Sequence, residues 1–258
     1  SAPSLYARPI VLDDSLQSVH FGRDVSFLED KSKNLTIADV TQGDLLWEQS
    51  DVEALNFGFT SSAYWFRFTV DNQVEQEREW FFELTYPLLD FIDIYVPQPG
   101  GLFKKIKAGD HYPFSHREIT DKDFVFRMTQ PPGEHTYYVR VDTATSLNFE
   151  PIMRSYSAYV HKFNTVYPIF WIYYGALLIM VIYNLVLFSL IREIHIIYLA
   201  AFISLFLLLQ FSLTGFAFQY LWPDAVWWAN NCVPILIGLT VFVLLLFVRD
   251  FVNITEVE

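Results

Sequence analysis

The chain has 258 residues, of which 53% are hydrophobic, and its formal net charge is −12 at pH 7. This excess of negative charge argues against nucleic acid as a partner, because binding to phosphates requires clustered positive charge. The only cysteine, Cys232, excludes a disulfide within the chain, so its folded parts must be held together by apolar cores.

The charges divide the chain into a soluble half and a membrane half. Residues 1–162 contain 15 of the 17 Lys and Arg and 24 of the 29 Asp and Glu, so this half has a net charge of −9. The next 29 residues, Phe163–Ile191, contain no Lys, Arg, Asp, Glu or His. A helix needs about 20 apolar residues to cross the core of a bilayer. The sequence therefore predicts a soluble domain at residues 1–160, followed by membrane spans.

The soluble half contains many short segments with the composition of β-strands. The clearest strands are predicted at Ala63–Asp71, Glu79–Tyr86, Leu89–Pro97, Phe124–Thr129 and Thr136–Thr143, and weaker ones at Pro9–Leu12, Val25–Leu28, Leu102–Lys107 and Phe149–Tyr156. Turn residues such as Pro131-Pro132-Gly133 separate them, and one short helix is predicted near Leu35–Val40. Closely spaced strands without long helices between them favour an antiparallel β-sandwich.

Alternation with period two gives each clear strand a core face and a second face. The predicted core face is apolar: Tyr64, Phe66, Phe68, Val70, Trp80, Phe82, Leu84, Ile92, Ile94, Val96, Phe124, Phe126, Met128, Tyr137, Val139 and Val141. The second face mixes aromatic rings with charges: Trp65, Arg67, Asp93, Tyr95, Tyr138 and Arg140. Rings among hydrogen-bonding groups suit a glycan or another small polar ligand, so these six residues are the candidate ligand site.

A purely structural role for this second face is the alternative interpretation. The charged side chains Arg67, Asp93 and Arg140 would then form a ladder of ion pairs, and Trp65 would be covered by the N-terminal segment. The loop that contains Asp110 and Arg117 is the next candidate for a ligand site if the strand face proves structural.

Three membrane spans are predicted at 163–191, 196–222 and 225–248, with residues 249–258 at the cytoplasmic end. Arg192 follows the first span, whereas the Pro223-Asp224 loop has no positive residue, which favours a soluble domain outside the cell. Two aromatic clusters are then predicted on the same outer membrane surface: Trp171, Tyr173 and Tyr174, and Tyr220, Trp222, Trp227 and Trp228.

Polar residues within the predicted spans are Asn184, Gln210, Asn230 and Asn231, and we expect them to form hydrogen bonds between helices. The spans therefore require partners, either further spans of the same protein or a second subunit in a homodimer. Three spans that end near Glu258 without a following domain suggest that the chain is a fragment of a longer protein.

Several sequence blocks are distinctive in their order and spacing: Leu55–Phe68 (LNFGFTSSAYWFRF), Leu89-Asp90 with Asp93-Ile94-Tyr95, Gly109-Asp110 with Pro113-Phe114 and Arg117, Tyr138-Val139-Arg140, Tyr174-Gly175, Tyr183-Asn184 and Phe247–Phe251. Together they resemble bacterial seven-transmembrane receptors with diverse intracellular signalling modules. The resemblance covers nearly the whole chain. It implies a periplasmic jelly-roll sensor domain like a carbohydrate-binding module, seven membrane spans, and a cytoplasmic output, commonly a histidine kinase or a diguanylate cyclase.

Metal binding is a weaker interpretation of two groups of residues. Asp90 and Asp93 are candidate calcium ligands, because hard cations bind clustered oxygens, although turn and cross-strand roles are equally compatible with them. The segment from Asp110 to Glu118 contains two histidines but no zinc-type spacing, and within it Asp110 and Arg117 are expected to pair. No other cofactor is expected.

The sequence contains no residues in a catalytic context, so no enzyme activity is expected of this segment. We interpret it as the sensory and membrane-spanning part of a bacterial inner-membrane receptor, with a periplasmic ligand and a cytoplasmic signalling domain outside this chain. Two alternatives stay open: a membrane-tethered carbohydrate-binding or adhesion module without signalling, and a transporter fragment with an accessory domain.

Overall fold

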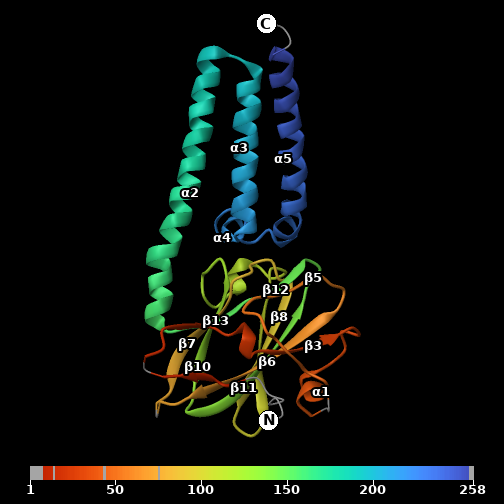
Figure 1. Cartoon of the computed structure of the whole chain (residues 1–258), viewed down its shortest axis with the longest axis vertical. Helices are drawn as coiled ribbons and strands as arrows, with labels where there is room; N and C mark the ends of the chain where they lie inside the picture. Colours follow the sequence, from red (N-terminus) through yellow and green to blue (C-terminus); the bar gives the residue numbers. More distant parts are fainter. Residues whose placement is uncertain (1–7, 14, 43–44, 75, 256–258) are drawn as a thin grey trace. The chain divides into compact units, whose positions relative to one another are not determined.

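The computed structural model describes residues 8–13, 15–42, 45–74 and 76–255 (Figure 1). It contains two compact units, Ser1–Val160 and His161–Glu258, and each is considered by itself. The start of the predicted soluble domain (residues 1–7) and the last part of the predicted cytoplasmic end (residues 256–258) lie outside the described residues.

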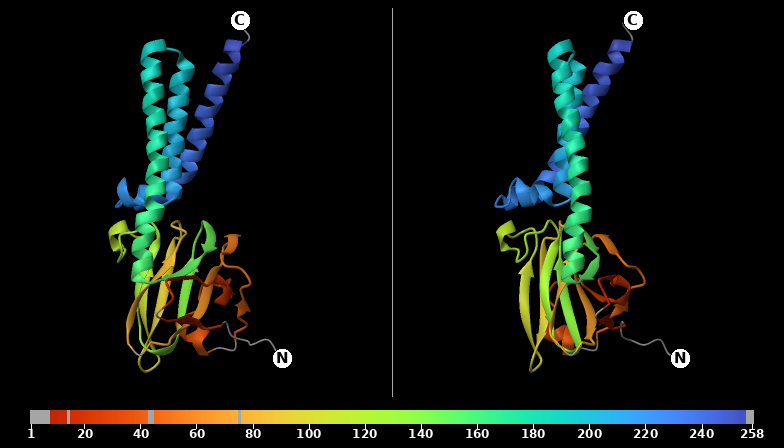
Figure 2. Two further views of the ribbon diagram at one scale, coloured as in Figure 1. Left: turned by 60° about the vertical axis from the view of Figure 1, so that its left-hand side comes forward. Right: turned by 90° about the vertical axis from the view of Figure 1, so that its left-hand side faces the viewer.

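The first unit is a β-sandwich (Figures 1 and 2). Among the described residues, the larger sheet has the order β4-β3-β6-β11-β8-β9 with β1 parallel to β6, the smaller has the order β10-β7-β13-β2, and β12 pairs with β5. The strands are β1 (Ile10–Leu12), β2 (Ser18–His20), β3 (Ser26–Asp30), β4 (Glu48–Gln49), β5 (Leu55–Phe59), β6 (Ala63–Asn72), β7 (Arg78–Leu84), β8 (Phe91–Gln98), β9 (Leu102–Ala108), β10 (Phe124–Gln130), β11 (Gly133–Asp142), β12 (Ser146–Phe149) and β13 (Pro151–Arg154).

The five clearest predicted strands are confirmed as β6, β7, β8, β10 and β11. The predicted strand Phe149–Tyr156 is wrong as a single element. It is divided between β12 and β13, and Tyr156 begins a helix. Ser155 ends the strand region because its hydroxyl accepts a hydrogen bond from the N–H of Ala158, as an N-cap residue does.

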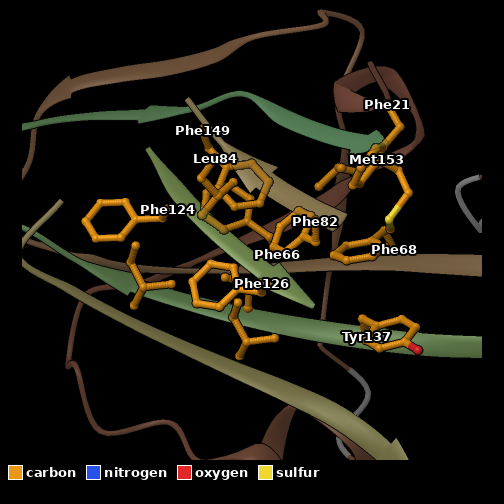
Figure 3. Close-up of a cluster of buried hydrophobic side chains, with 14 of the residues drawn as sticks. Phe21, Phe66, Phe68, Phe82, Leu84, Phe124, Phe126, Tyr137, Phe149 and Met153 are labelled. Carbon is orange, nitrogen blue, oxygen red and sulfur yellow. The ribbon is translucent and has the colours of Figure 1, made fainter. Parts of the chain in front are cut away.

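The core lies between the sheets and contains the predicted core face together with further buried residues such as Phe21, Phe149 and Met153 (Figure 3). All of those side chains are buried except Val96, which is partly buried and packs against the others. Aromatic rings connect different strands: Phe66 of β6 stacks on Phe149 of β12 at 3.7 Å between ring centroids, and Phe68 lies 5.4 Å from Phe82 of β7. Burial of these rings supplies the main driving force for folding in a domain without disulfides.

Within the described part of the first unit, three short helices lie outside the two sheets: η1 (Gly22–Asp24), α1 (Ile37–Gln42) and η2 (Phe114–His116). The helix predicted near Leu35–Val40 is α1. Its start is fixed by Thr36, whose N–H and hydroxyl both donate to the carboxylate of Asp39. This local cap holds α1 in place over the larger sheet.

The second unit contains helices α2 (Tyr156–Ile191, of which the first turn belongs to the first unit), α3 (Ile194–Leu213), α4 (Phe216–Tyr220) and α5 (Val226–Thr255). Among the described residues, α2, α3 and α5 are long and apolar enough to cross a membrane. The segment predicted as one span at 196–222 is interrupted after Leu213. Gly215 has a φ of 84°, which favours glycine and ends the helical path before α4.

Rings from the two predicted aromatic clusters of the membrane half lie close together. Trp171 of α2, in the first cluster, lies 5.6 Å from Tyr220 of α4, in the second. Within the second cluster, Trp222 lies 6.0 Å from Trp228 of α5. The two clusters thus lie side by side, and their location on the outer membrane surface stays a prediction.

Three of the four predicted polar side chains of the spans form hydrogen bonds within their own helix, and bonds to further spans or a second subunit stay a prediction. The side-chain amides of Asn184, Asn230 and Asn231 each donate to a carbonyl one turn earlier in their own helix, at 2.7–2.9 Å. A hydrogen bond between segments comes instead from Tyr174, whose hydroxyl lies 2.7 Å from that of Thr214.

Candidate functional site

The structure brings the six residues of the predicted strand-face site together. In the register of the larger sheet, Tyr138 of β11 lies opposite Arg67 of β6 and Tyr95 of β8. Arg140 lies opposite Trp65 on one side and Asp93 on the other. Period-two alternation therefore assigned these side chains to one face correctly.

This face is covered, so the predicted open ligand surface is not present in the structure. Trp65 is fully buried, and Tyr95 and Tyr138 are only 7% and 8% exposed. The covering side chains come mainly from α1 and its flanking segments: Leu28, Leu35, Ile37, Val40, Leu45, Trp47 and Phe103. Trp65 stacks on Tyr95, with 5.4 Å between their centroids, and cannot offer its ring to a sugar. The rings of this face pack as a second, smaller core.

The charged residues of the face form contacts around this smaller core. Asp93 accepts a hydrogen bond from the ammonium of Lys105 at 2.8 Å, and Arg67 lies over the Trp47 ring at 4.5 Å. Arg140 donates to the carbonyl of Lys33 at 3.2 Å, which connects the sheet to the segment before α1. The face therefore has a structural role, as in the alternative interpretation, but Asp93 pairs with Lys105 and Arg140 with Asp142, two residues outside the predicted ladder.

A different group of functional side chains meets where β8 begins. Asp90, Asp110 and His111 each offer one ligand atom, and these atoms all lie within 4.8 Å of one another. The Nε2 atom of His111 lies 3.7 Å from Oδ2 of Asp90. Asp90 and Asp110 are buried, whereas the His111 side chain is 40% exposed. Asp93, the other candidate calcium ligand, is not part of this group: it lies on the covered face and pairs with Lys105.

Backbone contacts hold this group in place. The N–H of Asp110 donates to the carbonyl of Leu89 at 2.9 Å. The N–H of His111 donates to the carbonyl of Asp90 at 3.4 Å. Gly109 makes this approach possible: it has a φ of 135°, and a Cβ atom there would lie 1.9 Å from the carbonyl oxygen of Asp90. Any larger residue at position 109 would separate the two segments.

The environment of Asp110 opposes a negative charge on its carboxyl group. Burial, and then the neighbouring charge of Asp90, raise the pKa of Asp110 to about 7, although the positive charge of Arg117 acts in the opposite direction. The charge of Arg117 thus acts on Asp110, and the predicted pairing of the two side chains stays a prediction. A carboxyl group with such a pKa responds to protons and cations near neutral pH.

Four rings next to these carboxylates form a surface that we name the ring cluster: Phe91, His111 and His116, which are exposed, and Tyr112, which is partly buried. Phe91 lies 4.7 Å from His111 and 6.2 Å from Tyr112, and Tyr112 stacks on His116 at 4.8 Å. Phe91 is 41% exposed. A nearby pocket bounded by His116, Arg117 and Lys107 has a volume of about 50 Å³, enough for a few water molecules.

The loop that contains these groups also contacts the first turn of α2, within the first unit. Arg117 donates to the carbonyls of Asp121, Lys122 and Asp123 at 2.8–3.1 Å and so fixes the end of the loop. Asp121 is fully buried and accepts a hydrogen bond from the hydroxyl of Tyr159 at 3.0 Å. We name this contact the junction.

Two neighbouring contacts support the junction. The Tyr159 ring stacks on Phe81 of β7 at 4.8 Å, and Glu83 of the same strand is buried and accepts a 2.8 Å hydrogen bond from Arg154. Sequence reasoning missed Tyr112, Asp121 and Tyr159. Only the run of His, Tyr and Phe after Asp110 signalled the ring cluster, and no local signal related Asp121 to a residue 38 positions later.

Comparison with known families gives two matches that cover most of the chain. Residues 22–155 match the family model "7TMR-DISM extracellular 2", and residues 167–258 match "7TM diverse intracellular signalling". No curated protein matches the chain.

Solved structures with some similarity contain sugar-active or sugar-binding proteins. A family 43 arabinoxylan arabinofuranohydrolase from Bacillus subtilis has 13% identity and a TM-score of 0.27. The matched region covers 57% of this chain and 28% of the hydrolase chain. An α-xylosidase from Xanthomonas citri has 12% identity and a TM-score of 0.25, with 51% and 15% covered. A carbohydrate-binding module of the β-sandwich superfamily has 10% identity and a TM-score of 0.23, with 54% and 52% covered. The chain thus spans about half or less of each of these relatives, and such low scores support no functional argument.

Proposed function

The chain belongs to the 7TMR-DISM family of membrane receptors with an extracellular sensor domain, and from this premise we propose that it senses a small polar ligand in the bacterial periplasm and controls a cytoplasmic output. The membrane is the inner membrane, and the ligand is a glycan or a molecule with similar polar groups. The output is a signalling enzyme, a histidine kinase or a diguanylate cyclase, that lies outside this chain.

The ring cluster is the surface that we propose for the ligand. Exposed aromatic rings bind the apolar faces of sugars, and nearby polar groups add hydrogen bonds. The ring cluster combines such rings with the carboxylates of Asp90 and Asp110. The strand face around Trp65 has the same composition but is covered.

One observation carries the signalling part of this proposal: a single loop contains three of the four rings of the ring cluster and also Asp121 of the junction. His111 and Tyr112 belong to the ring cluster, Arg117 binds the carbonyls at the end of the same loop, and Asp121 binds Tyr159 in the first turn of α2. A ligand that binds one of two loop positions more tightly shifts the balance between them, and this hydrogen bond passes the shift to the helix.

The substitution Tyr159→Phe tests this coupling. It removes the hydroxyl that binds Asp121 but keeps the ring on Phe81, so the sandwich stays folded. In membranes that contain the full-length receptor, we expect the basal output, measured as autophosphorylation or cyclic dinucleotide formation, to change several-fold. The matched control is Tyr156→Phe, whose ring is 66% exposed. Equal output from Tyr159→Phe and wild type would contradict the coupling, and a receptor without output would favour the tethered binding module.

The proposed location has its own test. Alkaline phosphatase is active only outside the cytoplasm, so a fusion after residue 160 should be active and a fusion after His195 inactive. The reverse result would contradict both the periplasmic location and the sensor function.

A further inference from the structure

The group Asp90, Asp110 and His111 contains the donor atoms of a metal site. Its three ligand atoms lie within 4.8 Å of one another, and the measured pair, Nε2 of His111 and Oδ2 of Asp90, is 3.7 Å apart. In a tetrahedral zinc site with bonds of 2.0–2.1 Å, neighbouring ligand atoms are about 3.4 Å apart. A small rotation of the exposed His111 ring would reach that distance. We infer that these three residues bind a divalent transition-metal ion of the zinc class.

The type of ligand atoms selects the metal. Calcium prefers six to eight oxygen ligands, and magnesium keeps several waters in an oxygen octahedron. Two carboxylates and one imidazole instead suit zinc, which in many proteins has three protein ligands and an open fourth position. The presence of His111 therefore favours zinc over the calcium that the oxygens of Asp90 alone suggest.

Hydrogen bonds from neighbouring residues orient the Asp90 carboxylate of this group. Thr143 donates its hydroxyl to Oδ1 of Asp90 at 3.2 Å, and the N–H of Ala144 donates to Oδ2 at 2.8 Å. Such outer contacts orient metal ligands and strengthen binding. Gly109 keeps the segment with Asp110 and His111 against Asp90. The exposed His111 leaves a path by which an ion enters from the solvent.

The charge of the site also favours a bound metal ion. Two carboxylates are buried close together, which is costly unless positive charge compensates them. In a purely structural arrangement, Arg117 supplies positive charge next to Asp110. A divalent ion bound by the three residues would supply it instead. These two arrangements differ in whether the site takes up metal, and that can be measured.

A bound ion would also fix the ring cluster. His111 is both a ligand in this inference and the ring that contacts Phe91 at 4.7 Å. Metal binding would therefore stabilise the position of the loop that ends at the junction. The inference itself is independent of the proposed receptor function, because it is tested by metal binding without any output.

The test uses the full 258-residue chain in detergent micelles after removal of metal with a chelator. Zinc chloride is titrated by calorimetry, with calcium chloride in a parallel titration, and cobalt(II) is added to record the visible bands of a four- or five-coordinate site. We expect one zinc site per chain, weaker calcium binding, and cobalt bands that zinc abolishes. Absence of a zinc site, or calcium binding as tight as zinc binding, would overturn the inference.

Two histidine variants distinguish this site from ordinary surface binding. His111→Ala removes a ligand at an exposed position and should weaken zinc binding at least 10–100-fold, the range expected for loss of an outer partner alone. His116→Ala removes a neighbouring exposed histidine that is not part of the group, and it should bind zinc like wild type. Equal effects of the two variants would show adventitious binding and overturn the inference. Asp110→Asn should also lose the cobalt bands. If Asp110→Asn does not fold, the comparison of His111→Ala with His116→Ala by itself tests the inference.

Discussion

The covered strand face and the ring cluster have similar compositions but opposite environments. Both combine aromatic rings with carboxylates and basic groups. On the strand face the rings of Trp65, Tyr95 and Tyr138 are buried and the charges lie around them. In the loop region the rings of Phe91, His111 and His116 are exposed, Tyr112 is partly buried, and the carboxylates of Asp90 and Asp110 are buried. Composition alone therefore does not identify a binding surface. The deciding factor is whether another segment covers the rings.

The difference has an energetic basis. Covering the strand face removes several large apolar side chains from water, which stabilises the domain by about 25 cal/mol per Å² of apolar surface. Burying Asp90 and Asp110 destabilises the folded domain instead, because charged groups lose their hydration. A region that stabilises the fold and a region that costs stability are thus expected to respond differently to substitution, pH and ligands.

The largest expected effect is that of Trp65→Ala. Truncation of a fully buried ring should cost about 3–5 kcal/mol, or about 10 °C in the melting temperature of a domain of this size. Trp65→Phe should cost much less, because the indole N–H has no hydrogen-bond partner among the described residues. Thermal unfolding measures both. Stability that is unchanged in Trp65→Ala would show that the face is open in solution.

The next effect is the pH dependence that Asp110 contributes. Its folded pKa of about 7 lies above the ordinary value of 3.8, so the folded state binds this proton more tightly than the unfolded state. The contribution of Asp110 to the free energy of unfolding is therefore greatest below about pH 4. It falls as the pH rises to about 7 and stays low above that pH. The contribution at low pH exceeds that at high pH by about 4 kcal/mol.

Denaturation of chelator-treated protein at pH 5 and pH 8 measures this contribution. Asp110→Asn has no proton to lose, so its stability should change less between the two pH values than that of wild type. The same decrease in both proteins would contradict a perturbed Asp110 and assign the pH dependence to other groups.

An effect on affinity rather than stability is expected at the ring cluster. Tyr112→Ala should weaken ligand binding by about 1–3 kcal/mol, as loss of a stacked aromatic ring does, and should leave the melting temperature nearly unchanged. A sugar identified on a glycan array is titrated by calorimetry, and Phe59→Ala, an exposed ring on β5, is the control. If Tyr112→Ala binds like wild type and Trp65→Phe does not, the ligand uses the strand face.

The smallest effect is expected for Lys105→Ala. Its ion pair with Asp93 is short, at 2.8 Å, but the Lys105 side chain is 38% exposed and the pair is screened by water and salt. We expect a loss below about 1 kcal/mol that becomes smaller in high salt. A loss above 2 kcal/mol would show that this pair is needed to keep the strand face covered.

Much of the fold follows from local sequence patterns. Alternation along Ala63–Asp71 and Thr136–Thr143 correctly predicted which side chains enter the core, because successive side chains of a strand point to opposite faces. The apolar run Phe163–Ile191 predicted a membrane-capable helix from length and composition alone. The short strands β2 and β4 gave no such signal. Two or three residues contain too little pattern, and their pairing partners are distant in the chain.

The sequence by itself determined that Trp65, Tyr95 and Tyr138 share a face, and that Asp110 lies in a loop with two histidines. Only the tertiary structure decided that α1 covers the first group, and that Asp90 meets Asp110 and His111 across the close approach at Gly109. The physical reason is the range of the interactions. Backbone geometry fixes the direction of a side chain from its neighbours in sequence, whereas burial and charge depend on segments that are brought together only when the whole domain folds.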